Sequence, residues 1–502
     1  MRILLSSISL ETASDFQLAL YYLKSYLLKH CRLPLRKDDI TVRVFNETQI
    51  AGFIAGRILK DDPSLVGFSC YLWNITLTLE VCRLLKRRRP QLRIVLGGPE
   101  ASPRAEEILA KEPQVDLVVR GEGEVTFARM LETLGKGGPL SRVRGITFRR
   151  KAAIVSTPDR PTIKRLGVIP SPYLNGLIDL KDKAIIDVPL ETTRGCSFRC
   201  SYCYYHKNFP RLRFFPLSRV ERELKYILKS RPTEVYLMDA TFNANPRRAM
   251  KVLELFSRYN CGSTLHLELM AELVDEPMAR ALARANAAHI EIGLQSTNLP
   301  TLQLLNRPFD KERFSRGIAL LNRYNLVYEI QLIDALPLQT YGHILKALDW
   351  LYSLRPSKVE LFPLSVLAGT SLAGCSGRYG IAYDPAPPYR VYASKTLSRE
   401  QVLRLRTLRF AMDRLYDSMV FRRTLYALKD RAKIRIATVL EDWIDWESGI
   451  GKRGSDYPQQ LNRRLPEFLV FVLRRHGRMH LARQLAAGLS ADLAEYRKAY
   501  GA

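Results

Sequence analysis

The sequence has little cysteine, with eight such residues among 502. Cysteines this sparse and irregularly placed argue against a secreted scaffold held by disulfides, and they predict a reducing, cytoplasmic location. Long apolar runs are also lacking, so no segment is predicted to span a bilayer. The N-terminal segment lacks the charged region and the cleavage site of a signal peptide, and we interpret it as a first strand.

Acidic residues are few relative to basic ones: 50 Asp and Glu stand against 78 Lys and Arg, a formal net charge of +28. A surface of this charge attracts nucleic acid, anionic lipid or a phosphorylated substrate. The arginines are dispersed, however, and no nucleic-acid-binding motif accompanies them. We therefore interpret the charge as a general surface bias. An anionic substrate remains compatible with it, and so, less favoured, does a nucleic acid.

Short apolar strands alternate with helical segments over residues 1–150. The predicted strands are "RILLSSIS", "ITVRVFN", "LVGFSC", "LRIVLGGPEAS" and "VDLVVRGEGE". This alternation predicts a doubly wound, Rossmann-like α/β domain whose ligands lie beyond the carboxyl ends of the strands. Residues 151–184 contain several prolines and little periodicity, and we predict a linker there.

A second alternation covers residues 185–375. Its predicted strands are "AIIDVPLETT", "EVYLMDATF", "LHLELMAEL", "HIEIGLQST", "VYEIQLIDALP" and "KVELFPLSVL". Six strand–helix units predict a partial (β/α)6 barrel of the TIM type, with its chemistry at the carboxyl ends of the strands. Residues 376–502 turn helical and basic and are predicted to form a mostly α-helical C-terminal domain.

Three cysteines are crowded into "GCSFRCSYC", directly after the first predicted barrel strand. Cys196, Cys200 and Cys203 have the spacing C-x3-C-x2-C. Thiolates favour soft metals and iron–sulfur clusters. Three of them would hold three irons of a [4Fe-4S] cube and leave the fourth iron open to a chelating ligand. The alternative is a zinc loop or a set of buried cysteines.

With Tyr202 before the third cysteine, this loop resembles the C-x3-C-x-aromatic-C signature of the radical S-adenosylmethionine (SAM) superfamily. The resemblance covers roughly residues 185–375 and implies that SAM chelates the open iron. Reductive cleavage would then give a 5'-deoxyadenosyl radical, with the electron coming from an external flavodoxin or ferredoxin. The motifs "MDATF", "EIGLQST" and "LSVLAGTSL" resemble the family's SAM-binding strand ends, although a Gly-Gly-Glu type motif is absent. The implied SAM-binding residues are Tyr202, Asp239, Thr241, Glu291, Gln295, Ser296, Ala368 and Gly369.

The glycine-containing strand ends of residues 1–150 resemble the cobalamin-binding domain of the cobalamin-dependent radical SAM subclass. The implied cobalamin-binding residues are Ser69, Cys70, Tyr71, Trp73, Asn74, Gly97, Gly98, Glu122 and Gly123. The Asp-x-His-x-x-Gly motif of cobalamin mutases is missing, and His30 is the only histidine before the cysteines. We therefore expect no histidine ligand to cobalt, and a lower face capped by the loop "CYLWN". The alternatives are core aromatics, or a domain that no longer binds cobalamin.

These resemblances imply a cobalamin-dependent radical SAM enzyme that methylates an unactivated carbon of a small molecule or natural product. Other outcomes stay open: rearrangement or cyclisation without methyl transfer, modification of RNA, or a non-catalytic cobalamin or iron–sulfur sensor. The C-terminal region resembles the uncharacterised helical extension of such enzymes. Its Arg422, Arg423 and Lys429 could meet an anionic substrate, although a solvated helix face explains them as well.

Overall fold

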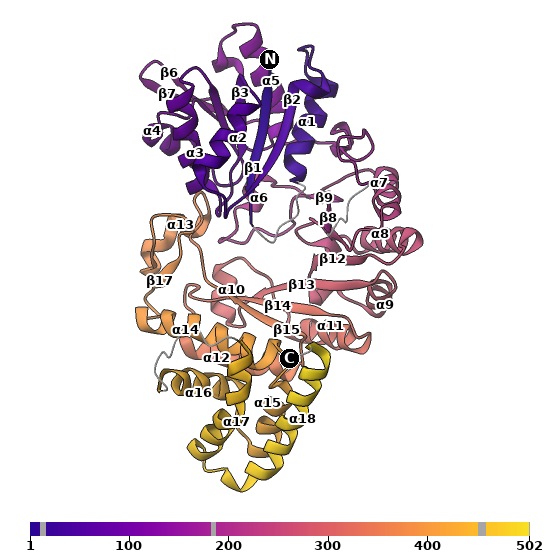
Figure 1. Cartoon of the computed structure of the whole chain (residues 1–502), viewed down its shortest axis with the longest axis vertical. Helices are drawn as coiled ribbons and strands as arrows, with labels where there is room; N and C mark the ends of the chain where they lie inside the picture. The colour runs from indigo at the N-terminus through magenta and orange to yellow at the C-terminus, as the bar shows by residue number, and fades with distance from the viewer. Residues whose placement is uncertain (11–16, 182–186, 450–457, 501–502) are drawn as a thin grey trace.

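The computed structural model describes residues 1–10, 17–181, 187–449 and 458–500. Three regions follow one another along its long axis: an N-terminal α/β region, a strand–helix region in the middle and a helical C-terminal region (Figure 1). No helix among the described residues is both long enough and apolar enough to cross a membrane.

The N-terminal region is built on a seven-stranded sheet of order β2-β1-β3-β4-β5-β6-β7. Its first five strands are parallel. They are β1 (Ile3–Ser9), β2 (Ile40–Asn46), β3 (Leu65–Ser69), β4 (Arg93–Gly97) and β5 (Leu117–Val119). Helices α2 (Ala51–Lys60), α3 (Ile75–Arg88) and α4 (Ala105–Lys111) share one apolar core with the sheet. Helices α1 (Leu18–His30) and α5 (Gly123–Gly135) share a second core. Two cores on opposite faces make the sheet doubly wound, as predicted.

The segment predicted as a linker contributes to the packing of both regions. β6 (Ile146–Arg150) and β7 (Ala153–Ser156) form a hairpin that pairs antiparallel with β5, so the first sheet extends to residue 156. Further along, Leu166, Ile169 and Tyr173 are buried in the barrel core. The prolines of this segment hid both features because they interrupt any periodic pattern. The predicted boundary at residues 184 and 185 lies outside the described residues.

The middle region is a six-stranded parallel sheet of order β8-β11-β12-β13-β14-β15, the predicted partial barrel. The strands are β8 (Asp187–Leu190), β11 (Glu234–Leu237), β12 (Thr264–Leu269), β13 (Ala287–Gln295), β14 (Tyr328–Ile333) and β15 (Lys358–Phe362). The helices between them are α7 (Leu217–Lys229), α8 (Pro246–Tyr259), α9 (Glu276–Arg284), α10 (Leu299–Leu304), α11 (Lys311–Arg323) and α12 (Tyr341–Ser353).

Alternation along the barrel strands separates an apolar outer face from a polar inner face. On β12, Leu265, Leu267 and Leu269 are buried under the helices, while His266 and Glu268 lie on the other face. Side chains of a strand alternate between its two faces, so the second set points into the barrel lumen. The lumen is therefore lined with ionisable groups.

The C-terminal region packs against the last barrel strand. Its helices are α13 (Ser371–Cys375), α14 (Arg399–Met412), α15 (Arg422–Ala432), α16 (Ile436–Gly449), α17 (Pro458–Arg475) and α18 (Ala482–Tyr500). Helix α14 and the segment Asp413–Asp417 contact β15, an edge strand of the open barrel. This contact shields backbone groups that an open edge would leave unpaired. A short hairpin of β16 (Ala382–Tyr383) and β17 (Val391–Ala393) precedes α14 and was not predicted, because strands this short carry no periodic signal.

Candidate functional site

The three-cysteine loop follows the first barrel strand and lies where the N-terminal and middle regions meet. Cys200 is buried, and Cys196 and Cys203 are half-buried. The loop is fixed from two sides, because Ser201 N donates to Leu305 O and Leu372 N donates to Ser201 O, each at 2.9 Å. The end of α10 and the start of α13 therefore hold the cysteines in place.

Hydrogen-bond donors surround the sulfur atoms. The backbone N–H of Phe198 donates to Cys196 Sγ at 3.4 Å, and Thr241 Oγ1 lies 3.9 Å from the same sulfur. Burial raises the pKa of the Cys196 and Cys203 thiols, while nearby backbone amides act to lower it. Donors aimed at sulfur stabilise thiolates, and a bound metal removes the thiol proton. The loop therefore fits a thiolate-held metal centre.

Asp239, implied as a SAM ligand, is bonded to the residues that lead into the cysteine loop. Its fully buried Oδ1 accepts hydrogen bonds from Thr192 N and Thr193 N, both at 2.8 Å. Its Oδ2 accepts from Thr192 Oγ1 at 2.5 Å. Burial raises the pKa of Asp239 to about 6 despite these bonds. The side chain positions the loop, and its assignment to SAM stays a prediction.

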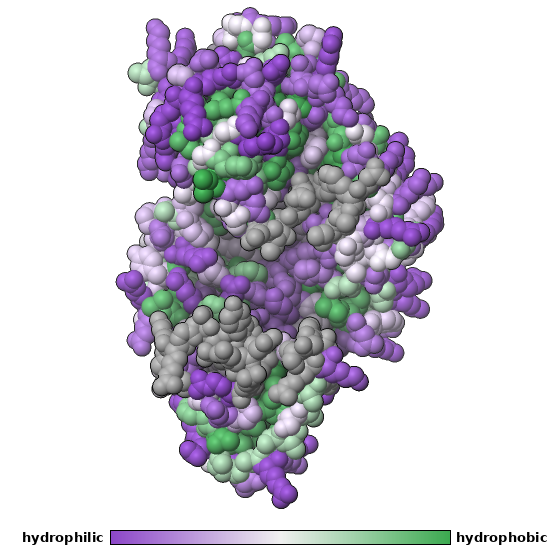
Figure 2. Space-filling view, viewed as in Figure 1, coloured by the Kyte–Doolittle hydropathy of each residue, from purple (hydrophilic) through white to green (hydrophobic). Residues whose placement is uncertain are grey.

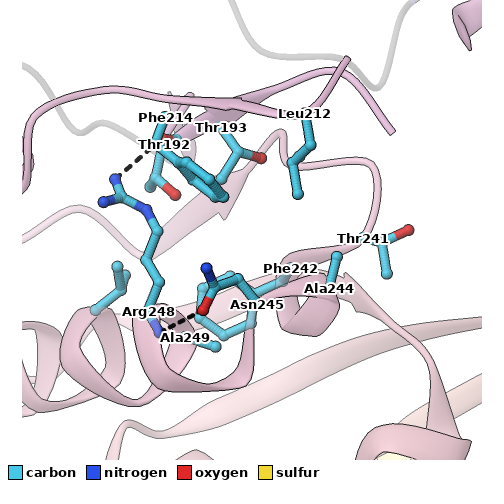
Figure 3. Close-up of a pocket in the computed structure, with 11 residues that line it drawn as sticks. Thr192, Thr193, Leu212, Phe214, Thr241, Phe242, Ala244, Asn245, Arg248 and Ala249 are labelled. Carbon is cyan, nitrogen blue, oxygen red and sulfur yellow. Dashed lines mark hydrogen bonds between the residues drawn. The ribbon is translucent and has the colours of Figure 1, made fainter. Parts of the chain in front are cut away.

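Behind this loop lies a small cavity between the first two barrel strands (Figure 3). Its volume of about 10 Å³ has room for about one water molecule, so it is not a cofactor site. Arg248 reaches past it to donate to Thr192 O at 3.2 Å, while its backbone N donates to Asn245 Oδ1 (Figure 3). Thr192 is thus fixed by both Asp239 and Arg248.

The polar side chains of the "EIGLQST" segment differ in their hydrogen-bond partners. Ser296 is buried, and its Oγ accepts from Gln339 Nε2 at 3.0 Å, which ties the end of β13 to the loop before α12. Glu291 faces the lumen, where it accepts from Gln331 Nε2 at 2.7 Å and lies 2.6 Å from His266 Nε2. Both side chains are thus already hydrogen-bonded within the fold, and their assignment to SAM stays a prediction. The half-buried side chain of Gln295 makes no hydrogen bond within the described residues, and it stays available.

Gly369 marks the place where three regions of the chain touch. Its φ is +75°, and a Cβ atom there would lie 2.7 Å from both Pro103 and Tyr204. Pro103 belongs to the N-terminal region and Tyr204 to the cysteine loop, so only glycine allows this approach. Ala368 is half-buried beside it, and Tyr202 packs against the barrel core.

Two of the implied cobalamin ligands are structural. Cys70 is fully buried, and its thiol faces Phe68 O at 3.9 Å. Asn74 is also fully buried: its Nδ2 donates to Ile8 O at 3.0 Å and its Oδ1 accepts from Tyr71 N at 2.8 Å. Asn74 thereby joins the ends of β1 and β3. Both side chains are fully buried, and their contact with cobalamin stays a prediction.

Glu122, another implied cobalamin ligand, lies in a buried ion cluster between the two regions. Its carboxylate is 3.2 Å from Arg194 and 2.8 Å from Arg213, and it accepts from Ile163 N at 2.6 Å. Arg194 also pairs with Glu124 at 2.8 Å. The neighbouring Gly123 packs against Leu23 of α1. Sequence spacing could not show this cluster, because its arginines come from the barrel.

The remaining implied residues do lie at the carboxyl ends of β3 and β4. Tyr71 and Trp73 are stacked, with ring centroids 4.6 Å apart, and Trp73 is 45% exposed. Ser69 and Gly97 end their strands, and Gly98 has φ +98° with its Cα next to the Cys70 backbone. His30 is far from this surface, because it bonds Val168 O at 2.9 Å.

Arg307 is a site residue that the sequence did not single out. Its guanidinium lies over the Phe198 ring at 5.4 Å and donates to Gly293 O. Burial raises the pKa of both Cys196 and Tyr202, and the Arg307 charge acts against that rise. The position follows α10 without any motif, so only the folded chain brings it to the cysteines.

Facing the lumen, Glu268 of β12 stands opposite Glu291 of β13. Burial and the nearby Glu291 charge raise the pKa of Glu268 to about 7. Burial lowers the pKa of His266, but hydrogen bonds to Glu234 and Glu291 outweigh it and raise that pKa to about 9. A hollow with largely hydrophilic walls lies between the N-terminal region and the barrel (Figure 2).

The C-terminal cations do not face this hollow. Arg422 donates to Tyr416 O at 2.9 Å and to Ser357 O at 2.6 Å, so it is a structural residue. Arg423 lies 3.5 Å from Asp492 of α18. Neither position supports the contact with an anionic substrate that was considered for it.

Family models match three stretches of the chain. The Radical SAM superfamily model matches residues 190–351 and the B12 binding domain model matches residues 35–131. A third family model, described as a protein of unknown function (DUF4080), matches residues 377–474. The three stretches fall in the three regions of the fold.

Individual proteins resemble the chain over shorter spans. It is 32% identical over 194 residues to the cobalamin-dependent radical SAM methyltransferase TokK of Streptomyces tokunonensis, covering 37% of this chain and 28% of TokK. It is 29% identical over 259 residues to anaerobic magnesium-protoporphyrin IX monomethyl ester cyclase of Synechocystis sp., covering 49% of this chain and 51% of the cyclase. The chain thus spans between about a quarter and a half of the length of these two relatives.

One solved structure has a similar arrangement over nearly the whole chain. It is the cobalamin-dependent S-adenosylmethionine radical enzyme OxsB with aqua-cobalamin bound. The TM-score is 0.66 at 16% identity, covering 99% of this chain and 81% of OxsB. At this identity the likeness shows a common fold.

Proposed function

We propose that this chain, which carries a B12-binding domain followed by a radical SAM domain, is a cobalamin-dependent radical SAM enzyme that methylates an unactivated carbon of a small molecule. One observation carries the proposal. The three-cysteine loop lies between the carboxyl ends of the parallel strands of the two sheets, where Gly369 closely approaches both Pro103 of the N-terminal region and Tyr204 of the loop. A cofactor on each sheet would therefore face the same hollow.

The residues divide into those that would hold cofactors and those that position them. Cys196, Cys200 and Cys203 would hold a [4Fe-4S] cluster, and Gln295 would be available to bind SAM. Ser69, Tyr71, Trp73, Gly97 and Gly98 would form the surface under cobalamin, with the stacked pair as a flat platform. The cluster supplies the electron that cleaves SAM, and cobalamin supplies a carrier for a methyl group. Asp239, Arg248 and Arg307 would position the cysteine loop.

We propose a small-molecule substrate. The lumen does not select its charge, because Glu268 has a pKa of about 7 through burial and the Glu291 charge, and Glu291 is itself paired with His266 at 2.6 Å. An external flavodoxin- or ferredoxin-type protein is the proposed electron donor.

The likeness to a cyclase favours a second candidate, radical ring formation without methyl transfer. The two outcomes consume SAM differently. Methylation yields both 5'-deoxyadenosine and S-adenosylhomocysteine, whereas cyclisation yields 5'-deoxyadenosine without S-adenosylhomocysteine. Product analysis therefore separates them without a known substrate.

The test uses anaerobically reconstituted full-length chain. We expect a corrinoid absorption spectrum together with both SAM products. Cys203→Ala should abolish 5'-deoxyadenosine formation, while Cys261→Ala, which removes an exposed thiol, should leave it unchanged. Formation of 5'-deoxyadenosine without bound corrinoid would contradict the role given to the N-terminal domain. A filled cluster with neither product would favour a sensor, and steeply salt-dependent RNA binding would favour an RNA-modifying enzyme.

A further inference from the structure

A second group of metal-ligand side chains lies on the inner face of the barrel, away from the cysteine loop. Glu234 is the first residue of β11, and His266 and His289 are the third residues of β12 and β13. One ligand atom from each lies within 4.8 Å of the other two. The early positions on parallel strands place the group toward the amino ends of the strands, opposite the carboxyl ends that carry the cysteines.

His266 is held as metal-binding histidines are usually held. One ring nitrogen, Nδ1, lies 3.2 Å from Glu234 Oε1. Two nitrogen or oxygen ligands on one tetrahedral zinc ion stand about 3.3 Å apart, so this spacing suits a shared ion. The other nitrogen, Nε2, lies 2.6 Å from Glu291 Oε1. A carboxylate behind the histidine fixes its tautomer and orientation in known metal sites.

The carboxylate behind His266 is itself held by a neighbouring side chain, Gln331. Gln331 Nε2 donates to Glu291 Oε2 at 2.7 Å and to Glu329 Oε1 at 2.8 Å. Glu291 is therefore itself fixed by a neighbour on β14. Ordered second-sphere partners of this kind accompany metal ligands because they reduce the cost of organising the site.

His289 has a ring that the fold leaves without a hydrogen-bond partner among the described residues. The ring stacks on His266, with centroids 3.7 Å apart and an angle of 12° between the planes. Its nitrogens thus remain free to act as ligands, and one of them lies within 4.8 Å of a ligand atom of Glu234 and of His266. An imidazole held against a second imidazole and a carboxylate, with no partner of its own, indicates a missing ligand.

We propose that Glu234, His266 and His289 bind a divalent transition-metal ion of the zinc type, at a site separate from the iron–sulfur cluster. Two imidazoles and one carboxylate are a ligand set that zinc and ferrous iron share, and they leave a fourth position open. Such an ion would connect β11, β12 and β13 near the amino ends of these strands, inside the barrel lumen.

The experiment measures zinc binding by the full-length chain after anaerobic reconstitution, with the cluster filled and excess metal removed. Titration calorimetry with ZnCl2 should show one zinc site per chain, in addition to the iron already bound in the cluster. His289→Gln removes a ligand without removing any hydrogen bond of the fold, and we expect affinity to fall at least tenfold. Glu291→Gln should weaken binding by about 10- to 100-fold, as loss of a second-sphere partner does. His480→Gln removes an exposed histidine of the C-terminal region and is the matched control.

X-ray absorption at the zinc edge tests the site on the unaltered chain, so the result does not depend on how any variant folds. Scattering from nitrogen and oxygen alone supports the proposal. Sulfur scattering would place the ion on the cysteines and overturn it. The absence of any zinc site in chains with a filled cluster would also overturn it. His266 would then be a protonated histidine held between Glu234 and Glu291. Equal affinity in the His289 and His480 variants would contradict it as well.

Discussion

Glu268 is a half-buried carboxyl group whose charged form is destabilised by folding. It lies in the barrel lumen opposite Glu291, and burial with this neighbouring charge raises its pKa to about 7 from its ordinary value of 4.5. A pKa raised by folding means that the protonated form is favoured in the native state. Its contribution to stability is therefore complete below about pH 4.5 and is lost as pH rises through about 7.

Replacing this residue should make stability less dependent on pH. Glu268→Gln keeps the shape and removes the charge, so we expect it to unfold at higher denaturant than the parent at pH 8. The advantage should shrink at pH 5 by about 2 kcal/mol. Denaturant unfolding of both chains at the two pH values measures this difference. Glu312→Gln, at an exposed position of α11, should show no such change.

Among the elements, the cysteine loop depends on anchors distant in sequence. Thr192 and Thr193 before the loop bond Asp239, Ser201 inside it bonds Leu305 and Leu372, and Arg248 donates to Thr192 O. None of these anchors is a cysteine. The loop should therefore lose its cluster when an anchor is removed, even though every thiol remains.

Asp239 provides a direct test of this dependence. Asp239→Ala leaves two buried backbone donors unpaired, at a cost of about 1–3 kcal/mol each. We expect a lower melting temperature and less iron per chain after desalting. Asp239→Asn is the conservative control, because its Oδ1 can still accept from both amides. Equal iron retention in the two variants would show that Asp239 does not position the loop.

At the scale of the whole molecule, buried charges join the N-terminal region to the barrel. Glu122 faces Arg194 and Arg213, and all three side chains are at most 9% exposed. Tyr389 of the C-terminal region and Arg104 form a second junction, where both contact Glu100. The N-terminal region is thus joined to the barrel and to the C-terminal region through specific polar contacts.

Removing Glu122 should loosen this junction. Glu122→Ala leaves two buried guanidinium groups short of a counter-charge, and breaking a buried pair costs about 3–5 kcal/mol. Denaturant unfolding should show this loss, and calorimetry should show the N-terminal region melting separately. Glu254→Ala breaks an exposed pair on α8 and should cost under about 1 kcal/mol. Similar losses in both variants would contradict a structural role for the interface cluster.

The sequence by itself determined the two strand–helix alternations and the three-cysteine loop. These features are local: strand periodicity is read within one segment, and the cysteine spacing lies within eight residues. The stacked Tyr71 and Trp73 at the end of β3 were likewise predictable, because they follow a strand directly.

Only the tertiary structure decided what the polar side chains do. Asp239 and Thr192 are 47 positions apart, and Glu122 and Arg213 are 91 positions apart. The candidate metal ligands Glu234, His266 and His289 come from three different strands. A buried polar group takes whichever partner the fold brings near, and strand register and domain docking set that partner. Strand register and domain docking leave no pattern in the sequence around the residue. Whether such a group binds a ligand or supports the structure is therefore decided by packing.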